Sequence, residues 1–179
     1  MKEDLRSTLS RKMLKDALLK LMQNRKAYDI NVRELCEKAG VNRSTFYRHY
    51  NNIADILEEI YDDIGKIIAE TNTSASHDPA HTGNHIYKAI DFFDKHPEYD
   101  PLILDEGRFL QIFSERFKPL IADSINISKS GNENAYLIDY LLGGTFIIIR
   151  NWIENNRKES AKQIADTIFV LSGNTVSGH

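Results

Sequence analysis

The sequence predicts an all-α fold of about nine helices. Apolar residues recur at helical spacing along most of the chain, and one such stripe runs from Ile53 to Ile68. No segment shows the sustained alternation or the hairpin turns that are typical of a β-sheet. Only four prolines and nine glycines interrupt the 179 residues, which leaves room for long helices.

Capping residues divide the N-terminal part into a long helix, two short helices and a second long helix. Asn31 is expected to cap the first short helix, with Glu34 three residues later in a capping-box position. Gly40 is expected to end it, because glycine adopts the left-handed conformation without steric cost. Asn51 and Asn52 are expected to cap the second long helix. The expected helices are residues 5–24, 32–39, 43–49 and a long helix from residue 53 onward.

Polar segments divide the C-terminal part. Residues 71–83 and 128–134 are rich in turn-forming residues and are expected to be loops, and the tail 172–179 is expected to be disordered. The expected elements are a helix from Ile86 to the residue before Pro97, a short segment at 98–105, a helix carrying Phe109, Phe113, Phe117 and Leu120, and helices over 135–155 and 160–171.

Charge divides the chain in the same sense. Residues 1–50 contain 12 Lys and Arg against 6 Asp and Glu, whereas residues 51–179 carry a net charge of −9 and the whole chain −3. A basic first part on an acidic second part is typical of a protein that presents one end to a polyanion. We therefore expect two domains, residues 1–50 and residues 51–179, connected by the fourth helix.

The composition indicates a soluble cytoplasmic protein. The single cysteine, Cys36, cannot form an internal disulfide and fits a reducing compartment. The N-terminus lacks the apolar core of a signal peptide. The longest apolar run, around residues 140–149, is far shorter than the ~20 residues that a membrane span needs, so no contact with a membrane is expected.

The two short helices and the glycine turn between them have the pattern of a helix-turn-helix. Arg43 and Arg48 can read guanine O6 and N7 with a bidentate fork, and the Thr45 methyl group can contact thymine. Tyr47, His49 and Asn31 are better suited to phosphate oxygens. The residues expected to face inward are Leu35, Cys36, Ala39, Val41, Phe46 and Tyr50. Those expected to face outward on the second helix are Asn42, Arg43, Ser44, Thr45, Tyr47, Arg48 and His49.

The segment NVRELCEKAGVNRSTFYRHYNNIADILEEI resembles the DNA-binding domain of the TetR/AcrR family of transcriptional regulators. The resemblance covers residues 9–61 and rests on many positions at fixed spacing: Asn31, Ala39-Gly40-Val41, Phe46-Tyr47, His49-Tyr50 and Asp55-Ile56-Leu57. It implies that Arg33, the 42–45 run and Arg48 contact bases or nearby backbone. It also implies that Asn31, Tyr47 and His49 hold phosphates. The family commonly has a lysine where this chain has Ile53, so that phosphate contact is not expected unless backbone N–H groups replace it.

The last two helices are the expected dimer interface. One helix-turn-helix at one half-site rarely binds tightly, so such modules normally act as two-fold dimers. The resemblance implies a four-helix bundle formed with the symmetry mates, and Gly143-Gly144 fits close helix approach or a kink. Core packing within one subunit is the alternative. The candidate interface residues are Leu141, Ile148, Trp152, Ile164, Ile168 and Phe169.

Aromatic residues of the C-terminal part are the candidate lining of a pocket for a small-molecule effector, although ordinary core packing produces the same spacing. The candidates are Tyr87, Phe92, Phe109, Phe113, Tyr140 and Phe146. The resemblance implies a homodimeric repressor that binds a palindromic operator and is released by such an effector. The effector must prefer one separation of the two DNA-binding domains.

Other functions have weaker support. His77, His81 and His85 recur every four residues, but Pro79 and Gly83 favour a solvated loop, so no metal site and no cofactor are expected. The chain has no glycine-rich phosphate loop and no nucleophile elbow, so we do not expect an enzyme. A helical adaptor that binds protein through its apolar eighth helix is the remaining alternative.

Overall fold

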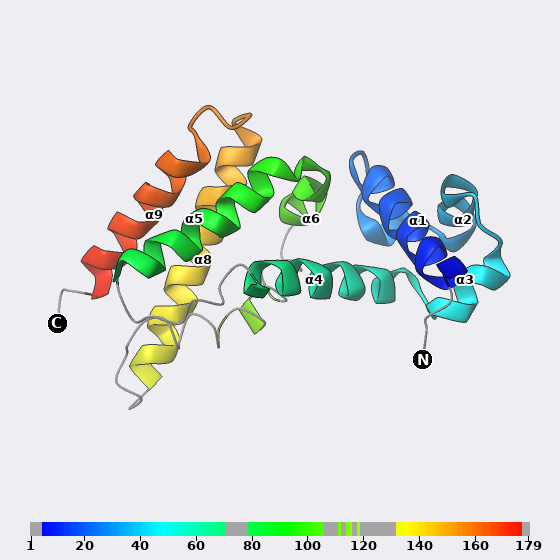
Figure 1. The fold of residues 1–179 in the computed structure, drawn as a ribbon, viewed down its shortest axis with the longest axis horizontal. Helices are drawn as coiled ribbons and strands as arrows, with labels where there is room; N and C mark the ends of the chain where they lie inside the picture. Colours follow the sequence, from blue (N-terminus) through cyan, green and yellow to red (C-terminus); the bar gives the residue numbers. More distant parts are fainter. Residues whose placement is uncertain are drawn as a thin grey trace. The chain divides into compact units, whose positions relative to one another are not determined.

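The computed structural model describes residues 5–70, 79–105 and 132–176, together with residues 111, 114, 115 and 118. Every helix or strand assigned within these residues is a helix, so the predicted all-α fold is confirmed (Figure 1). The elements in chain order are α1 (Leu5–Met22), η1 (Ala27–Asp29), α2 (Val32–Ala39), α3 (Arg43–His49), α4 (Ile53–Glu70), α5 (Pro79–Lys95), η2 (Pro97–Tyr99), α6 (Asp100–Leu104), α8 (Asn132–Glu154) and α9 (Ala161–Val176).

The chain forms two compact units, Met1–Ile64 and Gly65–His179. The division falls inside α4, so this helix contributes residues to both units. The boundary expected from the sequence, between residues 50 and 51, lies just before the start of the same helix. The assignment of a separate function to each part stays a prediction.

In the N-terminal unit, α1 packs against α2 and α3, and α2 packs against α3. Figure 1 shows these three helices at the blue and cyan end of the chain. Leu14, Leu18, Leu35 and Phe46 are fully buried. Since a seven-residue helix is not stable by itself in water, α3 depends on this packing.

The predicted ends of α2 are confirmed. The side chain of Asn31 caps the helix, with its Oδ1 accepting a hydrogen bond from the backbone N–H of Glu34 at 3.0 Å. Gly40 ends the helix with φ +68°, in the left-handed region that glycine adopts without steric cost. These two residues fix the direction in which the chain enters and leaves α2.

The start of α4 is held by reciprocal hydrogen bonds. Asn52 Oδ1 accepts from the backbone N–H of Asp55 at 3.2 Å, and Asp55 Oδ2 accepts from the backbone N–H of Asn51 at 2.7 Å. Asn52 therefore caps this helix as expected, whereas Asn51 acts as a donor to Asp55. The Asp55 carboxylate also interacts favourably with the positive end of the helix dipole.

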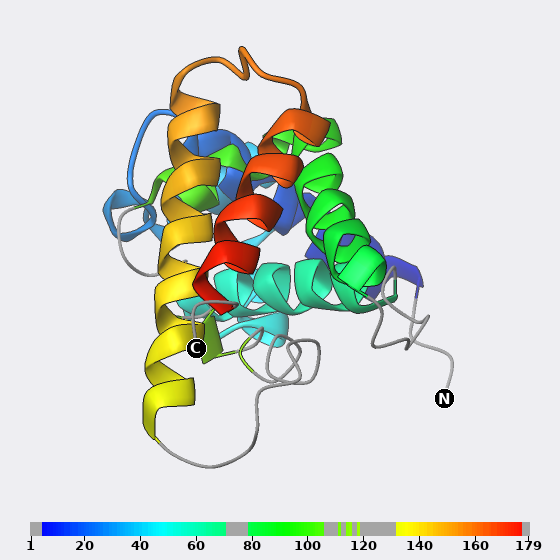
Figure 2. The same ribbon diagram turned by 90° about the vertical axis from the view of Figure 1, so that its left-hand side faces the viewer.

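In the C-terminal unit, α5 lies alongside α9 over much of its length, and α9 also packs against α8 (Figures 1 and 2). The short helix α6 packs against α8. The fully buried side chains of this unit are Ile90, Phe93, Leu102, Ile103, Leu142 and Trp152. The core thus draws on α5, α6 and α8, while α9 contributes the buried Ile164 and Ile168.

The connection between α8 and α9 is anchored by Arg157. Two backbone hydrogen bonds, from Asn156 N–H to the Ile153 carbonyl and from Arg157 N–H to the Trp152 carbonyl, end α8 in a Schellman motif. The Arg157 guanidinium donates to Asp100 Oδ1 at 2.5 Å and lies over the Trp152 ring. The connection is therefore joined to α6 by an ion pair.

Three sequence-based boundaries are wrong. A loop was expected at residues 71–83, but α5 already begins at Pro79. Proline is tolerated at the first position of a helix, because the N–H group that it lacks would have no partner within the helix there. The loop expected at 128–134 gives way to α8 at Asn132. The tail continues as helix to Val176, and Ser172 Oγ donates to the Ile168 carbonyl within α9. Residues 71–78, 128–131 and 177–179 lie outside the described part.

The expected helix carrying Phe109, Phe113, Phe117 and Leu120 also lies outside the described residues. Of the helices that the structure describes, none is long and apolar enough to cross a membrane.

Candidate nucleic-acid interface

The outer face of α3 carries polar side chains on a helix whose other face is buried. Phe46 is completely buried, whereas the adjacent Tyr47 side chain is 60% exposed. The Phe46 ring lies perpendicular to that of Tyr47 at 5.2 Å, and it also contacts the ring of Tyr50 at 5.9 Å. The buried aromatic pair therefore fixes the orientation in which α3 presents Tyr47 to solvent.

The residues predicted to face outward are found at the surface of this unit. Thr45 and His49 are half-buried, and the other members of the set are exposed: Asn42, Arg43, Ser44, Tyr47 and Arg48. Asn42 is the N-cap of α3, but its side chain makes no capping hydrogen bond, so its amide is not committed to the helix. Among the described residues, no carboxylate forms an ion pair with Arg43 or Arg48.

The predicted DNA-binding residues also include two at the start of α2, Asn31 and Arg33. The side-chain oxygen of Asn31 accepts the capping hydrogen bond from Glu34, so the side-chain NH₂ group is what Asn31 can offer as a donor. Arg33 is exposed and its Nε donates to Glu37 Oε1 at 2.8 Å. Sequence reasoning singled out Arg33 and missed Glu37, although the spacing of four residues on one helix was a signal for the pair.

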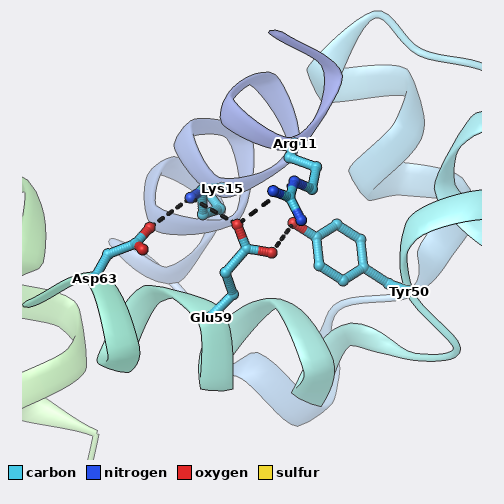
Figure 3. A network of polar contacts seen from close by, with 5 residues as sticks. All are labelled: Arg11, Lys15, Tyr50, Glu59 and Asp63. Carbon is cyan, nitrogen blue, oxygen red and sulfur yellow. Dashed lines mark hydrogen bonds and ion pairs between the residues drawn. The ribbon is translucent and has the colours of Figure 1, made fainter. Parts of the chain in front are cut away.

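A polar network joins α1, the end of α3 and α4 (Figure 3). Glu59 accepts a hydrogen bond from the Tyr50 hydroxyl at 2.8 Å and one from Lys15 Nζ at 3.0 Å. Lys15 also donates to Asp63 Oδ2 at 2.6 Å, and Arg11 Nε lies 3.8 Å from Glu59 Oε1. Because Tyr50 directly follows α3, this network couples the position of α3 to α4.

The ionisation of the network follows from its contacts. Burial alone would raise the pKa of Glu59, but the hydrogen bonds from Lys15 and Tyr50 and the nearby cations lower it below its ordinary value. Burial and the hydrogen bond to Glu59 raise the pKa of the Tyr50 phenol, so it remains a donor. Burial would lower the pKa of Lys15, but its two carboxylate partners raise it. All three groups therefore hold the charge states that the hydrogen bonds need.

The position that departs from the family pattern, Ile53, is the first residue of α4 and is half-buried. One of the backbone N–H groups at this helix start, that of Asp55, is already bonded to Asn52. The N–H groups of the first two residues of α4, Ile53 and Ala54, are the ones that could replace a lysine contact at this end.

Four of the six predicted interface residues are buried within the single chain: Leu141, Trp152, Ile164 and Ile168. The Trp152 indole N–H donates to the Glu159 carbonyl at 2.8 Å. Ile148 is half-buried and Phe169 is exposed. The four buried side chains thus pack inside one subunit, which is the alternative considered for them, and the interface itself stays a prediction.

The predicted pocket residues differ in their exposure to solvent. Phe92 and Phe146 are buried, Tyr87 is partly exposed, and Tyr140 is 66% exposed. The Phe92 ring stacks with Tyr99 at 5.7 Å and contacts His96 at 4.6 Å. Phe109 and Phe113 lie outside the described residues, so the pocket stays a prediction.

The histidines do not lie as the sequence suggested. His81 and His85 lie in α5, four residues apart on a helix rather than in a loop, and His77 is outside the described residues. Nowhere in the described ranges do three or more His, Cys, Asp or Glu side chains gather as metal ligands would.

Known proteins match both units. The model of the bacterial regulatory proteins of the tetR family matches residues 15–60, and that of a transcriptional regulator C-terminal region matches residues 81–174. A helix-turn-helix of this geometry followed by such a region defines a transcriptional regulator. The chain belongs to the TetR family.

One known regulator is also similar to this chain in sequence. The chain is 24% identical over 167 residues to the uncharacterized HTH-type transcriptional regulator YxbF of Bacillus subtilis (strain 168). This alignment covers 88% of the present chain but 43% of the relative, so the chain spans less than half the length of that protein.

Solved structures share the fold at low identity. A TetR transcriptional regulator from Streptococcus agalactiae 2603V superposes with a TM-score of 0.73 at 17% identity, covering 93% of this chain and 95% of that one. The fatty acid degradation regulator FadR from Bacillus halodurans gives 0.72 at 14%, with 99% and 98% covered. The dihydroxyacetone kinase operon activator DhaS gives 0.62 at 19%, with 93% and 96% covered.

We expect the network around Glu59 to make the N-terminal unit sensitive to acid. We expect Glu59→Gln to lower the free energy of unfolding at pH 7 by about 1–3 kcal/mol, since hydrogen bonds to a half-buried charge are lost. Because the folded-state pKa of Glu59 is lowered, its contribution is present above its unfolded-state value of about 4.3 and is lost as the pH falls through the folded value.

Urea denaturation of both proteins between pH 7 and pH 3 measures this effect. The difference between wild type and variant should shrink at the acid end. Glu37→Gln, which alters an exposed pair, is the control and should change stability by a few tenths of a kcal/mol. A difference that stays constant down to pH 3 would contradict the assignment.

Proposed function

We propose that the protein is a homodimeric repressor that binds a palindromic operator through α2 and α3 and is released by a small-molecule effector. The observation that carries the DNA-binding part is the solvent face of α3, which has two arginines, hydroxyl groups and no acidic residue. Phe46 and Tyr50 hold the opposite face, so the polar face has a fixed orientation. A helix of this kind fits the major groove.

The contacts divide by chemistry. Arg43 and Arg48 are suited to guanine O6 and N7, and the Thr45 methyl group to thymine. Tyr47 and the side-chain NH₂ group of Asn31 are suited to phosphate oxygens, as is His49. Asn42 and Ser44 extend the polar run at the start of α3. Base contacts then give sequence preference, and phosphate contacts give register and salt dependence.

An exposed apolar stripe on α8 supports the homodimer. Tyr136, Tyr140 and Ile147 are 71%, 66% and 48% exposed in the single chain. Their spacing of four and seven residues places them on one face of the helix, together with Gly144. Stable homodimers cover such apolar faces.

The middle of α9 adds Phe169, Val170 and Leu171 to the exposed apolar surface of the same unit. A Cβ added to Gly144 would meet nothing within 4 Å, so packing among the described residues does not require glycine there. Close approach of a second copy of α8 would. The proposed interface therefore keeps Ile148 and Phe169 from the sequence-based set and adds the α8 stripe, including Tyr140.

Release by an effector is the third part of the proposal. It rests on the family and on buried aromatic residues of the C-terminal unit, Phe92 and Phe146 among them. An effector that favours a spacing of the two DNA-binding domains unfit for the operator relieves repression. One structural neighbour is named as an operon activator, so the sign of regulation needs its own test.

DNA binding is tested with a duplex recovered by the wild-type protein from a randomised library. Arg43→Ala should weaken binding to this duplex about 10- to 100-fold and relax its sequence preference, since a bidentate base contact is lost. Tyr47→Phe should weaken binding to all sequences alike. Gel shifts over a range of salt concentrations measure both. Lys95→Ala, an equal change of charge on α5, is the control. Recovery of no preferred duplex, or binding insensitive to salt, would rule out this function.

The dimer is tested by sedimentation equilibrium without DNA. Tyr140→Arg and Ile147→Arg should each halve the mass, because a charge would be buried without a partner. Tyr28→Arg, which alters a tyrosine that is 82% exposed in η1, should leave the mass unchanged. A wild-type protein that is monomeric at every concentration, or stripe variants that remain dimeric, would contradict the interface.

The effector is tested by a thermal-shift screen of small apolar compounds. A true effector should raise the melting temperature by mass action and, in a gel shift, release the recovered duplex. Phe146→Ala should reduce both effects. Compounds that stabilise the protein but strengthen DNA binding would reverse the proposed sign, and a screen in which no compound does both would count against effector release.

A further inference from the structure

The arginine of α2 is held differently from the arginines of α3. Arg33 Nε donates to Glu37 Oε1 at 2.8 Å, and the two side chains are 72% and 65% exposed. The residues lie one turn apart on α2, so the carboxylate reaches the guanidinium along the helix surface. In contrast, Arg43 and Arg48 have no carboxylate partner within the described part of the chain.

The atoms used by this pair leave the binding edge of the guanidinium open. A guanidinium has five N–H donors, and the Nε–H is the one bonded to Glu37. The two terminal nitrogens keep four donors, and one N–H of each nitrogen points away from the side-chain stem. They form the fork that matches guanine O6 and N7. The ion pair therefore restrains Arg33 without blocking an end-on contact.

The neighbouring carboxylate has a different partner. Glu34, the other acidic residue of α2 next to Arg33, is paired with Arg25. Its backbone N–H is bonded to Asn31. Glu37 is thus the residue of α2 whose carboxylate acts on Arg33.

Restraining a long side chain such as that of Arg33 affects the affinity of binding. An arginine that reaches a base from α2 must lose its rotamer freedom on binding, which costs affinity unless it is already ordered. A carboxylate on the next turn orders the arginine before DNA binds. The same carboxylate repels phosphate groups, which disfavours binding in positions other than the intended contact.

We propose that Glu37 is a positioning residue for DNA recognition, which orients Arg33 so that its terminal nitrogens meet a guanine edge in the major groove. The proposal rests on the proposed DNA binding through α2 and α3. It predicts that Glu37 favours the operator over other sequences, although its charge opposes DNA in general.

The experiment is a double-mutant cycle with Arg33→Ala, Glu37→Ala and the double variant. Kd is measured for the duplex that the wild-type protein recovers from a randomised library and for sheared genomic DNA. Glu37→Ala should weaken binding to the recovered duplex about 2- to 5-fold, as expected for an exposed pair, and leave binding to genomic DNA equal or tighter. In the Arg33→Ala background, the same change should no longer weaken binding. Base preferences lost by Glu37→Ala should coincide with those lost by Arg33→Ala.

Glu37→Gln keeps an acceptor for Nε without the charge and should restore part of the preference. Asp91→Asn removes one negative charge from an exposed pair on α5 and is the control for net charge. Equal tightening on both DNAs by the Glu37 variants would overturn the proposal, because Glu37 would then act by repulsion alone. Unchanged affinity, or a loss that persists without Arg33, would also overturn it. If the wild type recovers no duplex, it is the proposed DNA binding that fails.

Discussion

The orientation of a seven-residue helix is the constraint on which the N-terminal unit depends. α3 is too short to be stable alone, so its geometry comes from what its buried face touches. Phe46 supplies apolar burial, and Tyr50 supplies both burial and a hydroxyl that donates to Glu59 on α4. Glu59 is in turn held by Lys15 on α1. One carboxylate thereby connects three helices, and the outer face of α3 inherits its direction from them.

The local features of this unit could be predicted from the sequence, because each depends on residues a few positions apart. Asn31 and Gly40 set the ends of α2 as expected, and Phe46 and Tyr50 are buried as expected. The Glu59 network could not be predicted in the same way. Lys15 and Glu59 are 44 residues apart, and their pairing depends on how α1 packs against α4. Tyr50 was recognised as a core residue, whereas its role as a donor needed the structure.

In the C-terminal unit, the burial of individual residues could not be predicted from the sequence, for a different reason. α8 is apolar around most of its circumference, so periodicity does not say which apolar residues face the chain's own core. Trp152 was predicted to lie in an interface, where it would be exposed in a single chain, but it is buried. Tyr140 was predicted to line a pocket, where it would be buried, but it is exposed. The boundary errors at Pro79 and Asn132 arise because polar composition resembles a loop even where a helix begins.

The central claim is that the polar face of α3, together with the first turn of α2, is the surface that meets DNA. Hydrogen–deuterium exchange with and without the recovered duplex tests it most directly, since backbone protection is measured without altering any side chain. We expect exchange to slow in α2 and α3 when the duplex is added and to stay unchanged in α9. Protection confined to the C-terminal unit, or an unchanged exchange rate in α3 while DNA is bound, would contradict it.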